Sequence, residues 1–330
     1  MKRRVVITGL GAVTPLGLGV KPTWEALCQG KSGIGRITRF DASRLGCQIA
    51  GEVKDFDPTV FIAKKELKKM DTFIQYALAA SQMAVDDAKF SLESPGQAER
   101  AGVSIGAGIG GLPAIEHYHE LMLKDGPRKI SPFFIPMLIV NLAPGQVSIR
   151  FGFKGPNLSV VTACASGNHA LGEALRIIQR GEADAMLAGG TESVITELAL
   201  GGFDSMRALS TRNDEPTRAS RPFDAQRDGF VMGEGAGILM LEELESARKR
   251  GARIYAELIG FGMSGDAYHI TSPLPDGEGA ANCMRRCLAD AQIVPHEVDY
   301  INAHGTSTPP GDVQETKAIK AVFGEQAYIL

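Results

Sequence analysis

The sequence predicts an α/β protein in which apolar strands alternate with helices and are covered by helices on both faces. Short β-branched runs such as residues 4–8 alternate with stretches whose apolar residues recur at helical spacing, such as residues 73–87. Several of the runs are apolar throughout, which is typical of strands buried on both faces. Hydrophobic residues make up 44% of the chain and charged residues 22%, as in an ordinary globular protein with a large core.

The expected elements follow one another along the chain with turn residues between them. The expected strands are residues 4–8, 101–105, 159–162, 183–188, 237–241, 254–261 and 298–303. The expected helices are residues 23–29, 73–87, 170–178, 244–250 and 280–291. Residues 201–235 show little periodicity and are rich in Arg, Asp, Ser and Gly. A long irregular segment inside a compact domain is more often functional than idle.

The length of 330 residues suggests about two domains. Residues 4–11 are loosely echoed by residues 255–262, and a weak boundary falls near residues 249–251. We therefore expect two related halves, residues 1–250 and residues 251–330. This arrangement would put Cys164 and His304 at equivalent strand ends, where open α/β sheets bind ligands.

Composition excludes several classes of partner and compartment. The chain has 35 Lys and Arg against 38 Asp and Glu, a net charge of -3, which offers no basic field for nucleic acid or an anionic membrane. We find no signal-peptide or transmembrane pattern. Five cysteines are sparse and odd in number, so a disulfide scaffold is not expected. These observations favour a cytoplasmic protein.

Cys164 stands where a β-branched run meets a helical pattern. A thiol at such a turn lies near unpaired backbone N–H groups and the positive end of the helix dipole, which favours the reactive thiolate. The competing interpretation is a buried, inert cysteine, the common fate of a free cysteine in a cytosolic chain.

His304 is the matching candidate in the second half. It follows an apolar run and enters a loop of small residues, where backbone can approach a ligand closely. Thr306 and Thr308 in the same loop could hydrogen-bond the amides of an extended ligand. Cys164 and His304 together would supply a nucleophile and a group that manages its proton. A core histidine bonded to backbone is the competing interpretation.

Two further patterns have rival interpretations. Residues 106–111 (GAGIGG) match a dinucleotide-binding loop, but no acidic strand end follows about 20 residues later, so we favour close backbone packing over NAD binding. A basic cluster at residues 64–69 would stack like charges on one helix face, which indicates an anionic partner. A solvated face is the alternative for the basic cluster.

The chain resembles the β-ketoacyl-[acyl-carrier-protein] synthases along its whole length, and within them most closely the elongating synthase II branch. The motifs that carry the resemblance are TACASG (162–167), NAHGTST (302–308), RVVITGLG (4–11), GIGG (108–111), PRKISPFF (127–134), AGG (188–190), RALST (207–211), RPFD (221–224) and RDGF (227–230).

The resemblance implies a thiolase-like fold of two similar α/β halves in an α-β-α-β-α layered arrangement, usually as a homodimer. It implies acyl transfer from the phosphopantetheine of an acyl carrier protein onto Cys164, followed by decarboxylative condensation with a malonyl carrier protein. His304 would help to drive decarboxylation and stabilise the enolate. No metal or other cofactor is implied, because phosphopantetheine arrives on the carrier protein.

The resemblance also assigns expected roles to residues outside the two motifs. Thr306 and Thr308 resemble positions that contact pantetheine, and Ile109 and Phe203 match positions that line the acyl pocket. The expected carrier-protein surface consists of Lys65, Lys69, Arg128, Lys129 and Arg207.

The family's sequences continue with an active-site lysine, a second catalytic histidine and a gating phenylalanine that this sequence does not contain. We therefore expect an incomplete second half, an active full-length parent and an impaired 330-residue chain, which robust elongation by that chain would contradict. The alternatives are a thiolase-type enzyme acting on coenzyme A thioesters and an inactive fragment that binds carrier protein.

Overall fold

A computed structural model describes residues 2–324 and 327, and the chain in it divides into two compact units. Unit 1 comprises Met1–Gly33, Gly51–Ala199 and Gly233–Leu258. Unit 2 comprises Ile34–Ala50, Leu200–Met232 and Ile259–Leu330. Each unit is therefore assembled from three stretches that are separated in the sequence.

Unit 1 is built on a seven-stranded mixed sheet. Its strand order is β2 (Gly17–Leu18), β1 (Val5–Thr14), β8 (Gly235–Glu243), β7 (Ala185–Glu192), β5 (Ala101–Gly106) and β6 (Asn157–Leu158), with β9 (Ala256–Glu257) also paired to β1. Strand β5 runs parallel to β6 and β7, whereas β8 pairs antiparallel with both β1 and β7. The order leaves β6 at one edge of the sheet.

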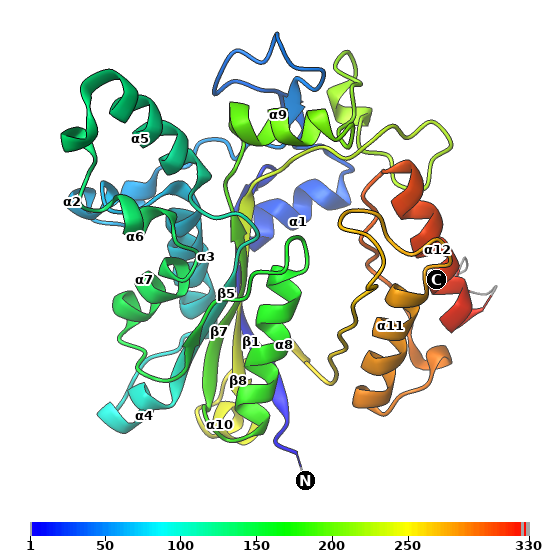
Figure 1. Ribbon diagram of the computed structural model, residues 1–330. Coiled ribbons are helices and arrows are strands. Elements are labelled where there is room, and N and C mark those ends of the chain that lie inside the picture. Colours follow the sequence, from blue (N-terminus) through cyan, green and yellow to red (C-terminus); the bar gives the residue numbers. More distant parts are fainter. Residues whose placement is uncertain (1, 325–326, 328–330) are drawn as a thin grey trace. The chain divides into compact units, whose positions relative to one another are not determined.

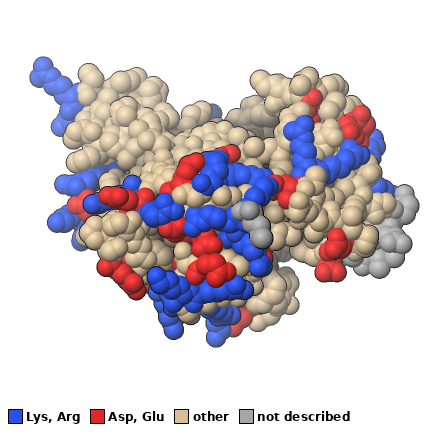
Figure 2. Space-filling model, turned by 90° about the horizontal axis from the view of Figure 1, so that it is seen from below, with Lys and Arg blue, Asp and Glu red and all other residues tan. Residues whose placement is uncertain are grey.

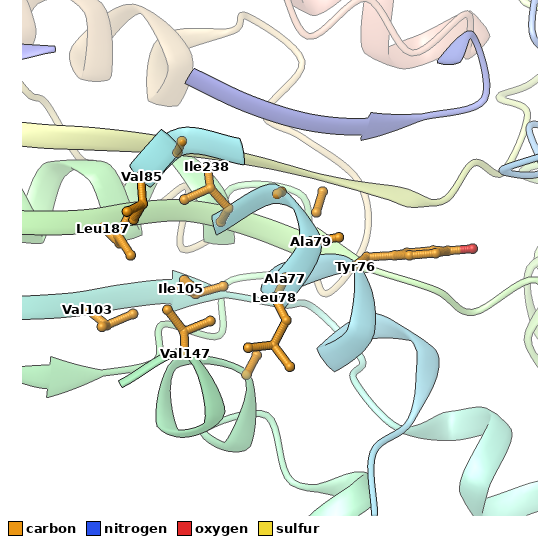
Figure 3. Packing of buried hydrophobic residues seen from close by; sticks show 14 of the residues in the cluster. Tyr76, Ala77, Leu78, Ala79, Val85, Val103, Ile105, Val147, Leu187 and Ile238 are labelled. Carbon is orange, nitrogen blue, oxygen red and sulfur yellow. The ribbon is translucent and has the colours of Figure 1, made fainter. Parts of the chain in front are cut away.

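Helices cover both faces of this sheet (Figure 1). Helices α3 (Thr72–Ala88) and α7 (Leu142–Phe151) pack on one face, and α8 (Ser166–Gln179) packs against β5 and β7 on the other. Between α3, α7 and the sheet, Leu78, Val147, Ile105 and Leu187 point toward one another (Figure 3), and each is buried. The predicted α/β architecture with strands covered on both faces is confirmed.

Helix α3 lies unusually close to β1. A Cβ atom added at Gly9 or Gly11 would overlap the carbonyl oxygens of Ala84 and Ala80 in α3. Apolar small residues on the helix, including Ala77 and Ala84, are fully buried against the strand. Glycine is required at these two positions because only its lack of a side chain allows the two backbones to touch.

The described residues of unit 2 contain one two-stranded ladder, β3 (Gly35–Arg36) with β4 (Ile49–Ala50), and two helices that pack together, α11 (Glu278–Ala291) and α12 (Pro309–Phe323). Helix α9 (Glu197–Ser205) crosses from unit 1 into unit 2. The remaining helices are α1 (Val20–Cys28), η1 (Pro58–Val60), α2 (Lys64–Leu67), α4 (Pro95–Glu99), α5 (Leu112–Asp125), η2 (Pro127–Lys129), α6 (Phe134–Leu138), η3 (Pro216–Arg218), α10 (Leu244–Lys249) and η4 (Pro295–Glu297).

Most predicted elements are confirmed, with shifted ends. The expected strands at 4–8, 101–105, 183–188 and 237–241 and all five expected helices are present. The strand expected at 159–162 is wrong, because pairing stops at Leu158 and the chain then turns into α8. The strand expected at 254–261 shrinks to Ala256–Glu257. Residues 298–303 pair with no described strand, since an apolar run becomes a strand only where a neighbour completes its ladder.

In the part of the chain that the structure describes, no helix has the length and hydropathy needed to cross a membrane. On the face drawn in Figure 2, Lys and Arg side chains are interspersed with Asp and Glu side chains rather than gathered into a surface of one sign. The mixture agrees with the nearly balanced charge of the sequence.

Candidate active site

Cys164 is exposed in the turn that joins β6 to α8. The turn is closed by Ser166, whose hydroxyl donates to the carbonyl of Ala163 (2.7 Å) and accepts the N–H of Thr162 (2.9 Å). Ala163 has a φ of 50°, which is uncommon for a residue with a side chain. Cys164 precedes a helix as predicted, but the strand before it ends at Leu158 rather than continuing to Thr162, and the interpretation of Cys164 as a buried thiol is wrong.

Cys47 provides the contrast. It is fully buried, and its thiol donates to the carbonyl of Ile49 (3.4 Å). Burial raises the pKa of the Cys47 thiol, which disfavours the reactive thiolate. Cys28 on α1 is exposed like Cys164, but it lies at the C-terminal end of its helix. Cys164 instead precedes the N-terminus of α8, so the positive end of that helix dipole lies beside it.

His169, in the first turn of helix α8, makes a second hydrogen bond to the turn that contains Cys164. Its Nδ1 lies 2.6 Å from Oγ1 of Thr162, so the hydroxyl and the imidazole share a hydrogen bond. Thr162 is thereby held through its side chain by His169 and through its N–H by Ser166. Ser166 and His169 were not among the predicted site residues, although both lie within five residues of Cys164.

The glycine-rich loop at residues 106–111 packs directly against the Cys164 turn. A Cβ atom added at Gly106 would overlap the carbonyl oxygen of Ser166, and one added at Gly108 would lie 3.3 Å from Cα of Ala163. The expected close backbone packing is confirmed. Ile109, the predicted acyl-pocket residue of this loop, is 41% exposed and lies in the same unit as Cys164.

The glycine loop is held by Glu192, the last residue of β7. Its carboxylate accepts the N–H groups of Gly108 (2.8 Å), Ile109 (2.8 Å) and Gly110 (2.9 Å). Burial raises the pKa of the Glu192 carboxyl, while the three N–H donors oppose that rise. Glu192 was not predicted to belong to the site. The sequence signal for it is an acidic residue at the end of an otherwise apolar strand.

In unit 2, His304 is exposed at the start of the predicted small-residue loop. Glu315 of α12 accepts the N–H groups of His304 (2.6 Å) and Gly305 (2.8 Å). The hydroxyls of Thr306 and Thr308 lie 2.8 Å apart, so both face the same side of the loop. The interpretation of His304 as a core histidine is wrong, because its side chain is exposed.

Asp312, on the same helix, fixes the rest of that loop. It is 2% exposed, and it accepts the N–H groups of Ser307 (3.1 Å) and Phe223 (2.7 Å). The guanidinium of Arg227 lies 3.3 Å from its carboxylate. Sequence analysis missed both carboxylates, although Asp312 and Glu315 stand three apart at the start of a helix and so share a face.

Phe203, the second predicted acyl-pocket residue, is half-buried on α9 in unit 2. Its ring packs edge-on against that of Phe230, with centroids 5.3 Å apart. The candidate residues thus fall into two sets: Cys164 and Ile109 belong to unit 1, and His304, Thr306, Thr308 and Phe203 belong to unit 2.

Four of the five predicted carrier-protein residues gather on neighbouring segments of unit 1. Lys69 pairs with Glu66 (2.7 Å) and lies 5.5 Å from the ring centroid of Phe133, which puts residues 64–69 beside the segment that contains Arg128 and Lys129. Lys65, Arg128 and Lys129 are exposed. Arg207 is also exposed, but it belongs to unit 2.

Comparison with protein families identifies both parts of the chain. Residues 2–247 match the model of the beta-ketoacyl synthase N-terminal domain, and residues 255–329 match that of the beta-ketoacyl synthase C-terminal domain. The chain is 57% identical over 329 residues to the 3-oxoacyl-[acyl-carrier-protein] synthase 2 of Coxiella burnetii, covering 100% of this chain and 79% of that protein. The enzyme of the same name from Vibrio harveyi is 53% identical, with 98% and 78% covered.

Solved structures give the same answer. A beta-ketoacyl synthase from Burkholderia phymatum superposes with a TM-score of 0.90 at 38% identity, covering 98% of this chain and 79% of that one. A type II PKS ketosynthase in complex with its acyl-carrier protein superposes with a TM-score of 0.87 at 36% identity, covering 99% and 79%. The predicted thiolase-like architecture is confirmed by these ketosynthase neighbours.

Proposed function

The chain belongs to the β-ketoacyl synthase family, and on that basis we propose that it condenses an acyl-[acyl-carrier-protein] with malonyl-[acyl-carrier-protein]. The products are a 3-oxoacyl-[acyl-carrier-protein], CO₂ and free carrier protein, in fatty acid elongation. The single observation that carries this proposal is the exposed thiol of Cys164 ahead of the N-terminus of α8. An acyl transferase needs such a nucleophile with N–H donors beside it.

In the first step, the Cys164 thiol loses its proton to solvent, and the thiolate attacks the carbonyl carbon of the acyl thioester. The bond between that carbon and the pantetheine sulfur breaks, and the pantetheine leaves as a thiolate that takes up a proton from solvent. The developing oxyanion is stabilised by backbone N–H groups at the turn, including that of Cys164 itself. The Ser166 bonds that close the turn hold these groups in place before substrate arrives.

In the second step, the malonyl thioester loses CO₂ and the electron pair remains on its α-carbon as an enolate. His304 stabilises the enolate oxygen, and Thr306 and Thr308 bind the pantetheine arm. The enolate carbon then attacks the acyl carbonyl, and the bond to Cys164 sulfur breaks. The carboxylates of Glu315 and Asp312 support this role, because they fix the backbone that carries His304 and both threonines.

The carrier protein is the partner that the basic residues fit. Lys65, Lys69, Arg128, Lys129 and Arg207 form its docking surface, and their charge accelerates encounter with an acidic protein. Ile109 and Phe203 line the acyl pocket. No cofactor is required, because phosphopantetheine is delivered by the carrier protein, and the reaction takes place in the cytoplasm.

A homodimer is part of the same proposal. Strand β6 stands at the edge of the sheet, and Val161 just beyond it is 55% exposed. A sheet edge with exposed apolar residues is a template for pairing with another chain. A second copy of this chain is therefore the natural partner for β6.

Intact-mass measurement after incubation with an acyl-carrier protein tests the nucleophile. The protein should gain the mass of one acyl group, Cys164→Ala should gain none, and Cys28→Ala should behave as the parent because it removes another exposed thiol. Acylation that persists in Cys164→Ala would sink the proposal. A thiolase-type enzyme would instead be acylated by acyl-coenzyme A in preference to the carrier protein.

A further inference from the structure

Three consecutive N–H groups converge on one carboxylate beside the Cys164 turn. Gly108 and Ile109 both donate to Oε2 of Glu192 (2.8 Å each), and Gly110 donates to Oε1 (2.9 Å). Successive N–H groups that point into one concavity form an anion-binding nest. Here the anion is a side chain of the protein itself, 82 residues or more away along the chain.

The loop is confined on both sides of that carboxylate. A Cβ atom at Gly108 would lie 3.2 Å from Oε2 of Glu192 and 3.3 Å from Cα of Ala163, so Gly108 fills the gap between the two. A Cβ atom at Gly110, whose φ is 78°, would lie 2.9 Å from Cγ2 of Val140. The backbone at 108–110 is therefore packed closely between Glu192, the Cys164 turn and Val140.

A second buried carboxylate fixes the far end of the same segment. Asp71, 7% exposed, accepts the N–H of Ala114 in the first turn of α5 (2.9 Å). Between the two carboxylates, Ile109 is 41% exposed, on a backbone that hydrogen bonds to Glu192 and Asp71 hold at both ends. A side chain on a backbone held in this way keeps one position, which is what selection by shape requires.

We infer that Glu192 is a positioning residue for acyl-chain selection, which holds residues 108–110 against the Cys164 turn and so sets where Ile109 meets the acyl chain. The inference rests on the proposed function, since the chain that Ile109 would meet is the acyl group delivered to Cys164. Glu192 touches no reacting atom and acts only through the loop.

Glu192→Gln tests this directly. The amide keeps the size of the side chain, but its NH₂ group faces an N–H donor and cannot accept, so part of the loop is released. We expect the rate of Cys164 acylation by tetradecanoyl-carrier protein to fall about tenfold, while the rate with hexanoyl-carrier protein falls less than about threefold. Alkylation of Cys164 by iodoacetamide should stay within about twofold, because the thiol itself is unchanged.

Glu120→Gln is the matched control, because Glu120 is an exposed glutamate on α5 and its replacement should leave both rates unchanged. Gly108→Ala provides a second variant that keeps the carboxylate charge and pushes on Glu192 and Ala163 together. Gly108→Ala should also lower the rate of acylation by tetradecanoyl-carrier protein more than the rate with hexanoyl-carrier protein. It provides the test if Glu192→Gln does not fold.

The outcomes separate the two proposals. Suppose that the parent protein is acylated with both chains. If Glu192→Gln or Gly108→Ala then lowers the two acylation rates by the same factor, or leaves both rates unchanged, Glu192 has no role in selection and the inference is overturned. If the parent protein is acylated by neither chain, the proposed function fails and the inference fails with it. Loss confined to the long chain in the variants supports the inference.

Discussion

Asp71 shows at the scale of one residue how burial makes a carboxyl group sensitive to pH. Burial raises its pKa to about 6, well above the ordinary value for an aspartate, although backbone N–H groups from Ala114, Thr72 and Phe73 lower it and the charge of Glu192 raises it further. The native state therefore holds this proton more tightly than the unfolded chain does. The stabilisation is fully present at pH values below the pKa of Asp71 in the unfolded chain, and it is lost as the pH rises through about 6.

Asp71→Asn should remove this pH dependence. Between pH 4 and pH 7.5, the free energy of unfolding of the parent should fall relative to that of the variant by about 2 kcal/mol, because the unfolded carboxyl is already partly ionised at pH 4. Urea titrations across this range measure the difference. Asp125→Asn, an exposed aspartate on α5, is the control. A difference between parent and Asp71→Asn that is constant with pH would contradict the assignment.

Asp312 carries a different prediction, because its carboxyl group is paired with the guanidinium of Arg227. It is 2% exposed and bound by Arg227 and two backbone N–H groups. Asp312→Ala removes the carboxylate partner of the mostly buried Arg227 guanidinium and leaves two backbone N–H groups without their acceptor, so the protein should lose about 3–5 kcal/mol of stability. Asp299→Ala, at an exposed position, should change stability by less than about 0.5 kcal/mol in the same denaturation measurement.

These residues also show where sequence reasoning about the site stops. Cys164 and His304 could be singled out because the local pattern marks each as a side chain at the end of an apolar run. The local pattern marks Glu192, Asp312 and Glu315 only as acidic residues at the end of a strand or the start of a helix, and it does not show which distant backbone N–H groups they bind. Nothing in a local pattern reports that Gly108 lies beside a residue 84 positions away.

At the scale of elements, helix α3 and strand β1 approach each other so closely that glycine is needed on the strand. A Cβ atom at Gly11 would overlap the carbonyl oxygen of Ala80, the closest such approach among the described glycines of unit 1. Gly11→Ala would place a methyl group on the carbonyl of Ala80, so helix and strand must separate. We expect a loss of about 1–3 kcal/mol or more in the free energy of unfolding. Gly96→Ala is the matched control, because a Cβ atom there meets open space in helix α4.

A Gly96→Ala variant should be neutral or slightly stabilising, since alanine is favoured over glycine in a helix by about 0.5–1 kcal/mol. Equal losses for Gly11→Ala and Gly96→Ala would show that the close approach of α3 to β1 does not matter. Thermal or urea unfolding of the two variants measures this.

The expected helices were predictable, but α5, α7, α9 and α12 were not foreseen, and the wrong strands fail for different reasons. Helical periodicity depends on neighbours within one segment, so all five expected helices form. A strand depends on a second segment, and the run at 298–303 has no ladder partner among the described residues. The run at 159–162 fails because the Ser166 bonds turn the chain instead.

At the scale of the whole molecule, the edge strand β6 is where we propose that two copies of the chain pair. Val161→Lys places a charge beside the sheet edge, which natural edge strands use to prevent pairing. We expect the dissociation constant of the homodimer to rise by about tenfold or more in analytical ultracentrifugation. Val60→Lys is the control, because Val60 is 73% exposed and lies far from β6 in the sequence. A parent protein that stays monomeric at micromolar concentration would exclude the edge-to-edge dimer.

The central claim is that Cys164 receives its acyl group from a carrier protein. The most direct measurement is the time course of acyl occupancy at Cys164, followed by mass spectrometry of the peptide that contains it, with the same acyl chain offered on carrier protein or on coenzyme A. We predict transfer to Cys164 alone among the five cysteines, and at least about tenfold faster from the carrier protein. Acylation of another cysteine, or faster transfer from coenzyme A, would contradict the account.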